Sequence, residues 1–194
     1  MQLVAATNNK NKIKEIKPLL PHSVELLLLS DINCLEDIPE TSPTIQGNAI
    51  QKAQYIYNKY GCNCFADDTG LEIEALNGEP GVYSARYAGA QKDANDNMDL
   101  VLKKLDGVSN RKARFITVIA LIIDGNLTCF EGIVNGEITP DKSGMEGFGY
   151  DPIFRPEGYD ITFSEMALDQ KNRISHRGKA TQKLVDFLTR NSLQ

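Results

Sequence analysis

Stretches whose apolar residues recur at helical spacing alternate with short apolar runs along this 194-residue chain. Helical spacing is found at residues 12–20, 48–60, 94–105 and 181–188. The strongest strand pattern, at residues 113–123, leads through the turn Asp124-Gly125-Asn126 into a second strand at 127–134. Strand–helix–strand units therefore come first and a long hairpin follows. This order predicts an α/β protein with a mixed β-sheet flanked by helices. No repeat or linker divides the chain, so we expect a single domain over residues 1–194.

The other expected strands are short apolar runs, at residues 3–6, 24–29, 64–66 and 71–76. The run at 24–29 is apolar enough to be buried on both faces. A long acidic loop is predicted at 31–47, and loops of this length inside a compact domain are commonly functional. The last helix is expected to begin near Arg177.

Composition excludes several classes of function. The net charge of −5 argues against a nucleic-acid-binding protein, which needs a basic surface. No segment has the roughly 18 apolar residues that cross a bilayer, and the first residues do not have the order of a signal peptide. We therefore expect a cytoplasmic protein with no membrane partner, whose four cysteines are reduced and mostly buried.

Asp67-Asp68-Thr69-Gly70 directly follows the apolar run at 64–66. Adjacent carboxylates repel each other unless a cation offsets them, which favours a divalent metal site over a plain acidic turn. Asp68-Thr69-Gly70 also matches the core motif of aspartic proteases. A single-chain protease of that kind needs a second copy, which is absent, and the dimeric kind is all-β, which the helical spacing contradicts.

The polar segment Thr7-Asn8-Asn9-Lys10-Asn11-Lys12 lies between an expected strand and an expected helix. A helix N-terminus attracts phosphate, and the lysines add positive charge, so this segment could cradle a triphosphate. A solvated polar turn is the other interpretation, and the GxxxxGK pattern of a Walker loop is absent.

Two later segments combine glycine, aromatic and basic residues. Gly147 and Gly149 allow a backbone to approach a ligand closely, and Phe148 between them could stack on a base or pack in the core. Ser175-His176-Arg177-Gly178 forms either a donor-rich pocket or an ordinary helix cap. In the acidic loop we expect Glu36 and Asp37 to be solvated, while Glu40 is the best candidate for a second metal ligand.

Taken together, these segments resemble the inosine triphosphate pyrophosphatase family. The resemblance runs in family order over nearly the whole chain. It comprises Thr7, Asn9 and Lys12, then Glu40-Thr41, Gly47-Asn48-Ala49 and Lys52-Ala53, FADDTGL at 65–71, PGVYSARYAG at 80–89, GFGYDPIF at 147–154 and SHRGKA at 175–180. Asn8 and Asn11 stand where the family often has glycine, and Thr69 where it often has serine.

The resemblance implies an elongated mixed β-sheet flanked by helices, with two lobes, an active site in the cleft between them, and usually a homodimer. It also implies hydrolysis of ITP, dITP and XTP to the monophosphate and pyrophosphate, which clears deaminated purines from the nucleotide pool. Asp68 would be the catalytic base, and Mg²⁺ would be held by Glu40, Asp68 and Asp67. Substrate contacts would come from Thr7, Asn8, Asn9, Lys10, Asn11, Lys12, Lys52, Thr69, Phe148, Gly149, Tyr150, Asp151, Lys171, His176 and Arg177.

Two other functions remain open at this point. One is a related pyrophosphatase that acts on modified pyrimidine nucleotides, which a panel of nucleotides would distinguish. The other is a regulatory protein that binds a nucleotide without cleaving it. The carboxylate pair argues against the second function, because a protein that only binds phosphate gains little from clustered negative charge.

Overall fold

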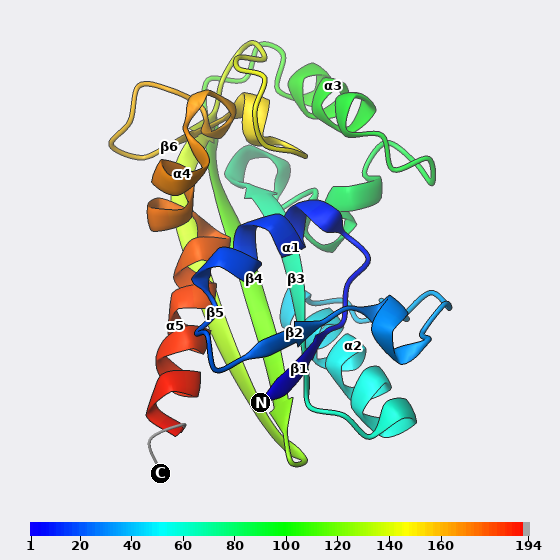
Figure 1. Cartoon of the computed structure of the whole chain (residues 1–194). Coiled ribbons are helices and arrows are strands. Elements are labelled where there is room, and N and C mark those ends of the chain that lie inside the picture. The colour runs from blue at the N-terminus through cyan, green and yellow to red at the C-terminus, as the bar shows by residue number, and fades with distance from the viewer. Residues whose placement is uncertain (192–194) are drawn as a thin grey trace. The chain divides into compact units, whose positions relative to one another are not determined.

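The computed structural model describes residues 1–191 (Figure 1). Its six strands form a sheet in the order β2-β1-β3-β4-β5-β6. The strands are β1 (Gln2–Ala5), β2 (Glu25–Leu27), β3 (Cys64–Ile73), β4 (Lys112–Ile123), β5 (Asn126–Ile138) and β6 (Phe154–Pro156). The α-helices are α1 (Lys10–Ile16), α2 (Ile45–Tyr60), α3 (Ala94–Lys104), α4 (Leu168–Ile174) and α5 (His176–Asn191). β1 pairs in parallel with both β2 and β3, while β5 and β6 are antiparallel, so the predicted mixed sheet is confirmed.

The chain divides into two compact units. Unit 1 comprises residues 1–68, 117–132 and 177–194, of which 192–194 lie outside the described part, and unit 2 comprises 69–116 and 133–176. The expectations of one domain ending at residue 194 and of a cleft between two lobes stay predictions.

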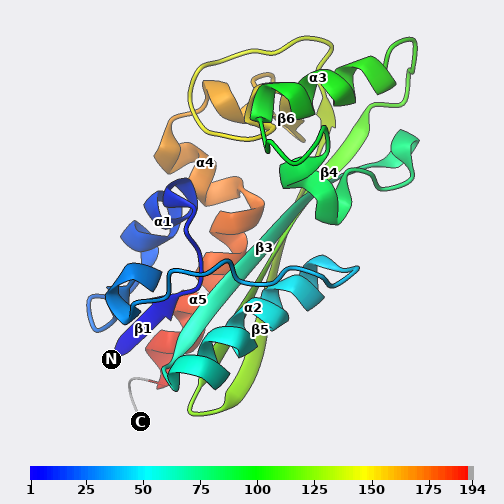
Figure 2. The same cartoon turned by 90° about the vertical axis from the view of Figure 1, so that its right-hand side faces the viewer.

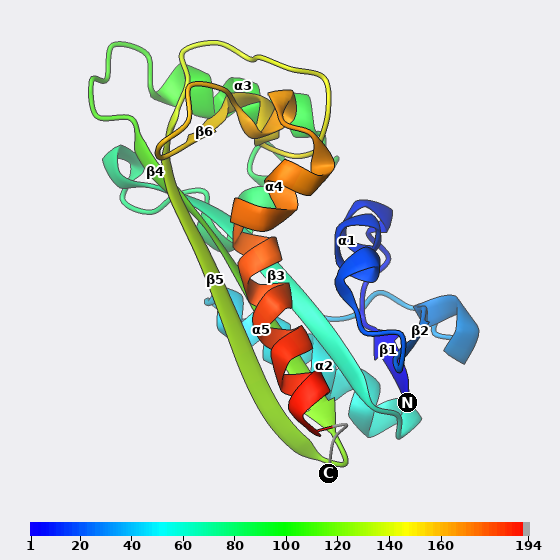
Figure 3. The same cartoon turned by 60° about the vertical axis from the view of Figure 1, so that its left-hand side comes forward.

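In unit 1, helices cover both faces of the strands (Figures 2 and 3). α1 and α5 pack on one face through Ile16 and Leu184, which share a buried cluster with Phe65 of β3. α2 lies on the other face and buries Ala49, Ala53 and Ile56 at helical spacing. Thr44 caps the first turn of α2 by accepting a hydrogen bond from the Gly47 N–H.

In unit 2, the apolar core covers one face of the strands. Leu71 and Phe115 pack there with Val101 of α3, and with Phe154 and Phe163. The other face carries charged side chains, because successive residues of a strand point to opposite faces. Arg114 pairs there with Glu72, and Arg155 pairs with Glu137.

The structure corrects two strand predictions. The separate strands expected at 64–66 and 71–76 are one continuous strand, β3, followed by a short 3-10 helix at Glu74–Leu76. Thr69-Gly70 is thus part of β3 and does not form a turn. Pairing with neighbouring strands stabilises the extended conformation there, and the local sequence does not reveal such pairing. β2 has only three residues and none is fully buried, so the prediction of burial on both faces is wrong. It is the edge strand of the sheet.

Every helix within residues 1–191 is too short or too polar to span a bilayer.

Candidate active site

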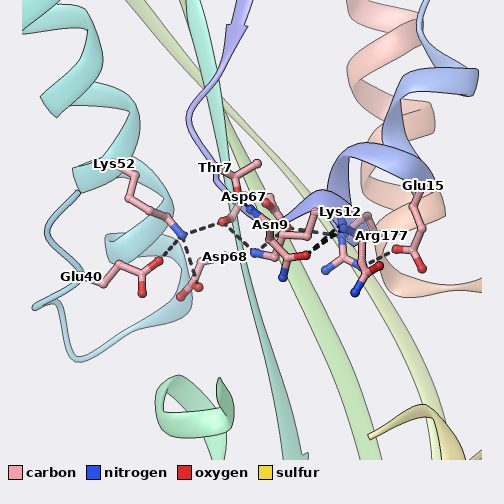
Figure 4. A network of polar contacts seen from close by, with 10 residues as sticks. Thr7, Asn9, Lys12, Glu15, Glu40, Lys52, Asp67, Asp68 and Arg177 are labelled. Carbon is pink, nitrogen blue, oxygen red and sulfur yellow. Dashed lines mark hydrogen bonds and ion pairs between the residues drawn. The ribbon is translucent and has the colours of Figure 1, made fainter. Parts of the chain in front are cut away.

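Asp67 and Asp68 are consecutive residues of β3, so the strand directs their side chains to opposite faces of the sheet. Asp67 meets Lys12 of α1 and Arg177 of α5, which cover one face. Asp68 meets Lys52 of α2, which covers the other (Figure 4). The strand itself therefore separates the two carboxylates, and each has its own cation. Lysine and arginine side chains thus offset the repulsion from which the sequence favoured a divalent metal.

The Asp67 carboxylate is almost completely buried. Its Oδ2 atom lies 3.0 Å from the Lys12 Nζ atom and 3.3 Å from the Arg177 Nε atom. Burial alone would raise the pKa of Asp67, but the positive charges of Lys12, Arg177 and Lys52 outweigh it and lower that pKa below its ordinary value. Asp67 is therefore fixed in its ionised form, which makes it a poor proton acceptor.

Glu15 holds Arg177 in place from the next turn of α1. The Arg177 Nη1 atom donates to the Glu15 Oε2 atom at 2.5 Å, and both side chains are buried. Glu15 was not among the site residues predicted from the sequence. Its position three residues after Lys12, on the same side of a helix, is the signal that could have found it.

The Asp68 carboxylate has a different environment. Burial is the largest influence and raises its pKa, while Lys52 and Lys12 oppose the increase. The Lys52 Nζ atom lies 3.6 Å from Asp68 Oδ1, and it donates to Glu40 Oε1 at 2.5 Å and to the Asp67 carbonyl at 2.7 Å. A carboxylate with a raised pKa beside a fixed cation is the better of the two aspartates for accepting a proton.

The charges of this cluster nearly cancel. Three cations, from Lys12, Lys52 and Arg177, face four carboxylates, from Glu15, Glu40, Asp67 and Asp68, which leaves a formal charge of −1. A triphosphate would therefore need additional positive charge in order to bind here.

The carboxylate oxygens of the cluster are the ligands that a hard divalent cation prefers. The buried Asp67 Oδ1 atom has no hydrogen-bond partner within residues 1–191, so it is available as such a ligand. No group of three or more His, Cys, Asp or Glu side chains in that part of the chain is arranged to hold an ion alone. The expectation that Glu40, Asp68 and Asp67 hold Mg²⁺ stays a prediction.

The polar segment before α1 is organised as a helix cap. Asn9 is the N-cap residue, and its Oδ1 atom accepts from the backbone N–H groups of Asn11 and Lys12. Thr7 Oγ1 accepts from the Asn9 N–H. Asn8, Lys10 and Asn11 are exposed, as the interpretation of a solvated turn predicts, and the phosphate cradle stays a prediction.

In unit 2, three of the predicted substrate-binding residues form one group. Asp151 Oδ2 lies 2.7 Å from the buried Lys171 Nζ atom and accepts from the Phe148 N–H at 2.7 Å. Lys171 Nζ also lies 5.0 Å from the centre of the Phe148 ring. Phe148 is half-buried, and the Lys171 ammonium lies over one face of its ring. The next residue, Gly149, has a positive φ of 64°.

Two other predicted substrate contacts in unit 2, Tyr150 and His176, have structural roles. The buried Tyr150 hydroxyl donates to the Ser84 carbonyl at 2.7 Å. The His176 ring is buried and stacks on Phe115, with 4.5 Å between the ring centres. Thr69, in β3, is half-buried. These three residues stay predictions as substrate contacts.

The predicted site residues thus fall into two groups. Unit 1 brings together Lys12, Glu40, Lys52, Asp67, Asp68 and Arg177, with Thr7 to Asn11 at the start of α1. Unit 2 contains Thr69, Phe148, Gly149, Tyr150, Asp151, Lys171 and His176.

Comparisons with known proteins agree with the resemblance seen in the sequence. A dITP/XTP pyrophosphatase from Flavobacterium johnsoniae is 62% identical over 97% of this chain and 98% of its own length. One from Flavobacterium psychrophilum is 61% identical over 96% of this chain and 98% of its own. The solved structure of the Staphylococcus aureus Ham1 protein matches with a TM-score of 0.91 and 40% identity, covering 98% of this chain and 100% of that one. The Ham1 family profile matches residues 3–187, and the chain therefore belongs to the Ham1 family.

Proposed function

We propose that this chain hydrolyses dITP, XTP and ITP to the nucleoside monophosphate and pyrophosphate, and so removes deaminated purine nucleotides. The name dITP/XTP pyrophosphatase, carried by relatives that align over nearly their full length, supports this substrate class. The observation that carries the proposal is the pair of strand carboxylates with opposite pKa shifts, set among buried cations.

Asp68 acts as the general base. Its raised pKa favours proton uptake from a water molecule, and that water attacks the α-phosphorus. The nearby Lys52 ammonium keeps the carboxylate ionised until the proton arrives. Asp67 does not compete for the proton, because Lys12 and Arg177 stabilise its charged form.

Lys12, Lys52 and Asn9 hold the departing pyrophosphate. Lys12 and Lys52 both donate to the Asp67 carbonyl, so the two ammonium groups are fixed close to each other and to the base. Positive charge that is already in position needs no reorganisation when negative charge develops on the leaving group.

Glu40 and Asp68, which both lie beside Lys52, are the residues that would hold Mg²⁺, and Asp67 on the other face of β3 would contribute its negative charge. The cluster has one carboxylate more than it has cations. When bound, Mg²⁺ would supply the positive charge that a triphosphate needs here and would lower the pKa of water. The carboxylates would hold it together with substrate oxygens.

Residues that offer hydrogen-bond donors or an aromatic face select the base of the nucleotide. Phe148 stacks on the purine ring, and Asp151 accepts from a ring N–H. Lys171 and His176 favour a 6-keto acceptor over the 6-amino group of adenine. Arg177 stays a prediction as a base contact, because its Nε and Nη1 atoms donate to Asp67 and Glu15. A site that hydrogen-bonds one such group rejects an analogue lacking it by roughly 10⁴-fold.

Pyrophosphate release from dITP, XTP, ITP, GTP and ATP, with and without Mg²⁺, tests the proposal. We expect turnover of the first three with Mg²⁺, little turnover of ATP, and a loss of about 100-fold or more in kcat for Asp68→Asn. Circular dichroism controls for the fold of the variant. Equal rates on ATP would refute the base selection, and near-normal activity of Asp68→Asn would refute the role of Asp68.

A further inference from the structure

The loop at residues 33–44 has neither helix nor strand, yet it carries Glu40. Between residues 34 and 38 its side chains alternate: Cys34 is buried, Glu36 and Ile38 are half-buried, and the odd-numbered side chains are exposed, Leu35 to 88%. The even-numbered side chains therefore face the protein, and Glu36 is among them. The expectation that Glu36 is merely solvated is wrong.

Glu36 receives three hydrogen bonds from the last two turns of α2. Its Oε1 atom accepts from Lys59 Nζ at 2.5 Å, from the Tyr60 hydroxyl at 2.8 Å and from the Tyr55 hydroxyl at 3.1 Å. The hydrogen bonds from Lys59 and then Tyr60 lower the pKa of Glu36 to about 2, so it is ionised at neutral pH. The Lys59 ammonium also lies 5.6 Å from the centres of both tyrosine rings. Three side chains of one helix thus converge on a single carboxylate oxygen.

A second attachment lies on the other side of Glu40. The Thr41 N–H donates to Gln51 Oε1 at 2.9 Å, and Gln51 Nε2 donates back to Thr41 Oγ1 at 2.9 Å. The Ser42 N–H donates to Asn48 Oδ1 at 2.8 Å. These partners belong to α2, as does Lys52, which contacts Glu40. The loop is therefore fixed to one rigid helix on both sides of Glu40, and only three residues separate Glu36 from it.

We propose that Glu36 is a positioning residue: it clamps the loop to the end of α2 and thereby holds the Glu40 carboxylate beside Lys52 and Asp68. Without the clamp, the loop keeps its buried Cys34 and its attachments at Thr41 and Ser42, but the segment between Cys34 and Glu40 loses its hydrogen bonds to α2 and gains conformational freedom. Glu40 then spends less time next to Lys52, and a cation shared by Glu40 and Asp68 binds more weakly. The link to Mg²⁺ rests on the proposed function, whereas the clamp itself does not.

The test compares Glu36→Ala with Asp37→Ala, a matched variant that removes the neighbouring exposed carboxylate of the same loop. Amide hydrogen exchange of the full chain without added metal is the first measurement. We expect faster exchange over residues 37–44 in Glu36→Ala, a smaller increase in Tyr60→Phe, and wild-type exchange in Asp37→Ala. Tyr60→Phe removes one donor and leaves the rest of the side chain, so it remains informative if Glu36→Ala does not fold.

The second measurement is the Mg²⁺ dependence of dITP hydrolysis. We expect the Mg²⁺ concentration for half-maximal rate to rise about fivefold in Glu36→Ala, with kcat at saturating Mg²⁺ within about twofold of wild type. A loss of fold alone would instead lower kcat at every Mg²⁺ concentration and leave the half-maximal concentration unchanged. That result, or wild-type exchange over residues 37–44, would overturn the proposal. If the wild type releases no pyrophosphate from dITP, the proposed function fails, while the exchange data still decide whether the clamp exists.

Discussion

Asparagine substitutions of Asp67 and Asp68 should have opposite consequences for stability. Asp67 is buried between Lys12 and Arg177, so Asp67→Asn keeps the shape of the side chain but leaves two buried cations with less compensation. Breaking a buried ion pair in this way costs about 3 kcal/mol or more of the free energy of unfolding. In a chain of this length, that corresponds to a decrease of roughly 6–12 °C in Tm. Asp68→Asn should be neutral or slightly stabilising, because burial disfavours the charge that it removes.

The pH dependence of the two variants follows from the directions of the pKa shifts. The pKa of Asp67 is lowered on folding, so its stabilising contribution is complete at neutral pH and is lost as the pH falls below the ordinary value of 3.8. The stability difference between wild type and Asp67→Asn should therefore shrink on acidification. The pKa of Asp68 is raised on folding, so its ionisation opposes folding at neutral pH. Any gain from Asp68→Asn should likewise vanish in acid.

Urea unfolding followed by circular dichroism, at pH 7 and at several acidic values, measures both effects. Each variant lacks one carboxylate of the wild type, so the two variants have the same formal charge and each is a control for the other. An Asp67→Asn variant as stable as Asp68→Asn at pH 7 would contradict the assignment of Asp67 to the buried cations. So would a difference from wild type that grows as the pH is lowered.

A pair of glycine substitutions and the alkylation of one cysteine test the local geometry. Gly147→Ala should destabilise by about 1–3 kcal/mol in thermal unfolding, because φ is 79° and an added Cβ would collide with the Asp151 carboxylate. Gly149→Ala is the matched control, with φ of 64° and open space around the Cβ, and should cost less; an equal cost would rule out the collision. The Cys64 thiol should resist alkylation in the native state, because burial and then the neighbouring Cys62 raise its pKa to about 12. Mass spectrometry after iodoacetamide treatment should find Cys64 labelled only on unfolding, and rapid native labelling would contradict its burial.

The parts of the fold that local sequence determines were predicted well. The turn between β4 and β5 has positive φ at both Asp124 and Gly125, which suits an Asp-Gly pair in a tight hairpin turn. The helices α2 and α3 were predicted to within three residues at every end, because their apolar faces repeat over several turns. β6 and α4 were missed. β6 has three residues and ends in proline, and α4 has seven, too few to establish a period.

The candidate site shows the same division. The segments that contain the site residues could be found from motifs, but their partners could not. Arg177 and Glu15 are 162 positions apart in sequence, and only the packing of α1 beside α5 brings them into contact. The continuity of β3 through Thr69 likewise depends on neighbouring strands, and it places the two aspartate side chains on opposite faces of the sheet.

The alternation along β3 also restricts how the length of this segment can change in evolution or in engineering. Adding or deleting one residue between Cys64 and Asp67 would exchange the two carboxylates between the α1–α5 side and the α2 side. An insertion of two residues would restore the sides but would shift both aspartates along the strand, away from Lys12 and Lys52. A substitution at a position such as Ala66 changes only the packing around that side chain. A change in the number of residues instead changes the face on which each aspartate lies, or its distance from Lys12 and Lys52. Chimaeras that exchange this strand between homologues should therefore keep its length unchanged, even where they change its composition.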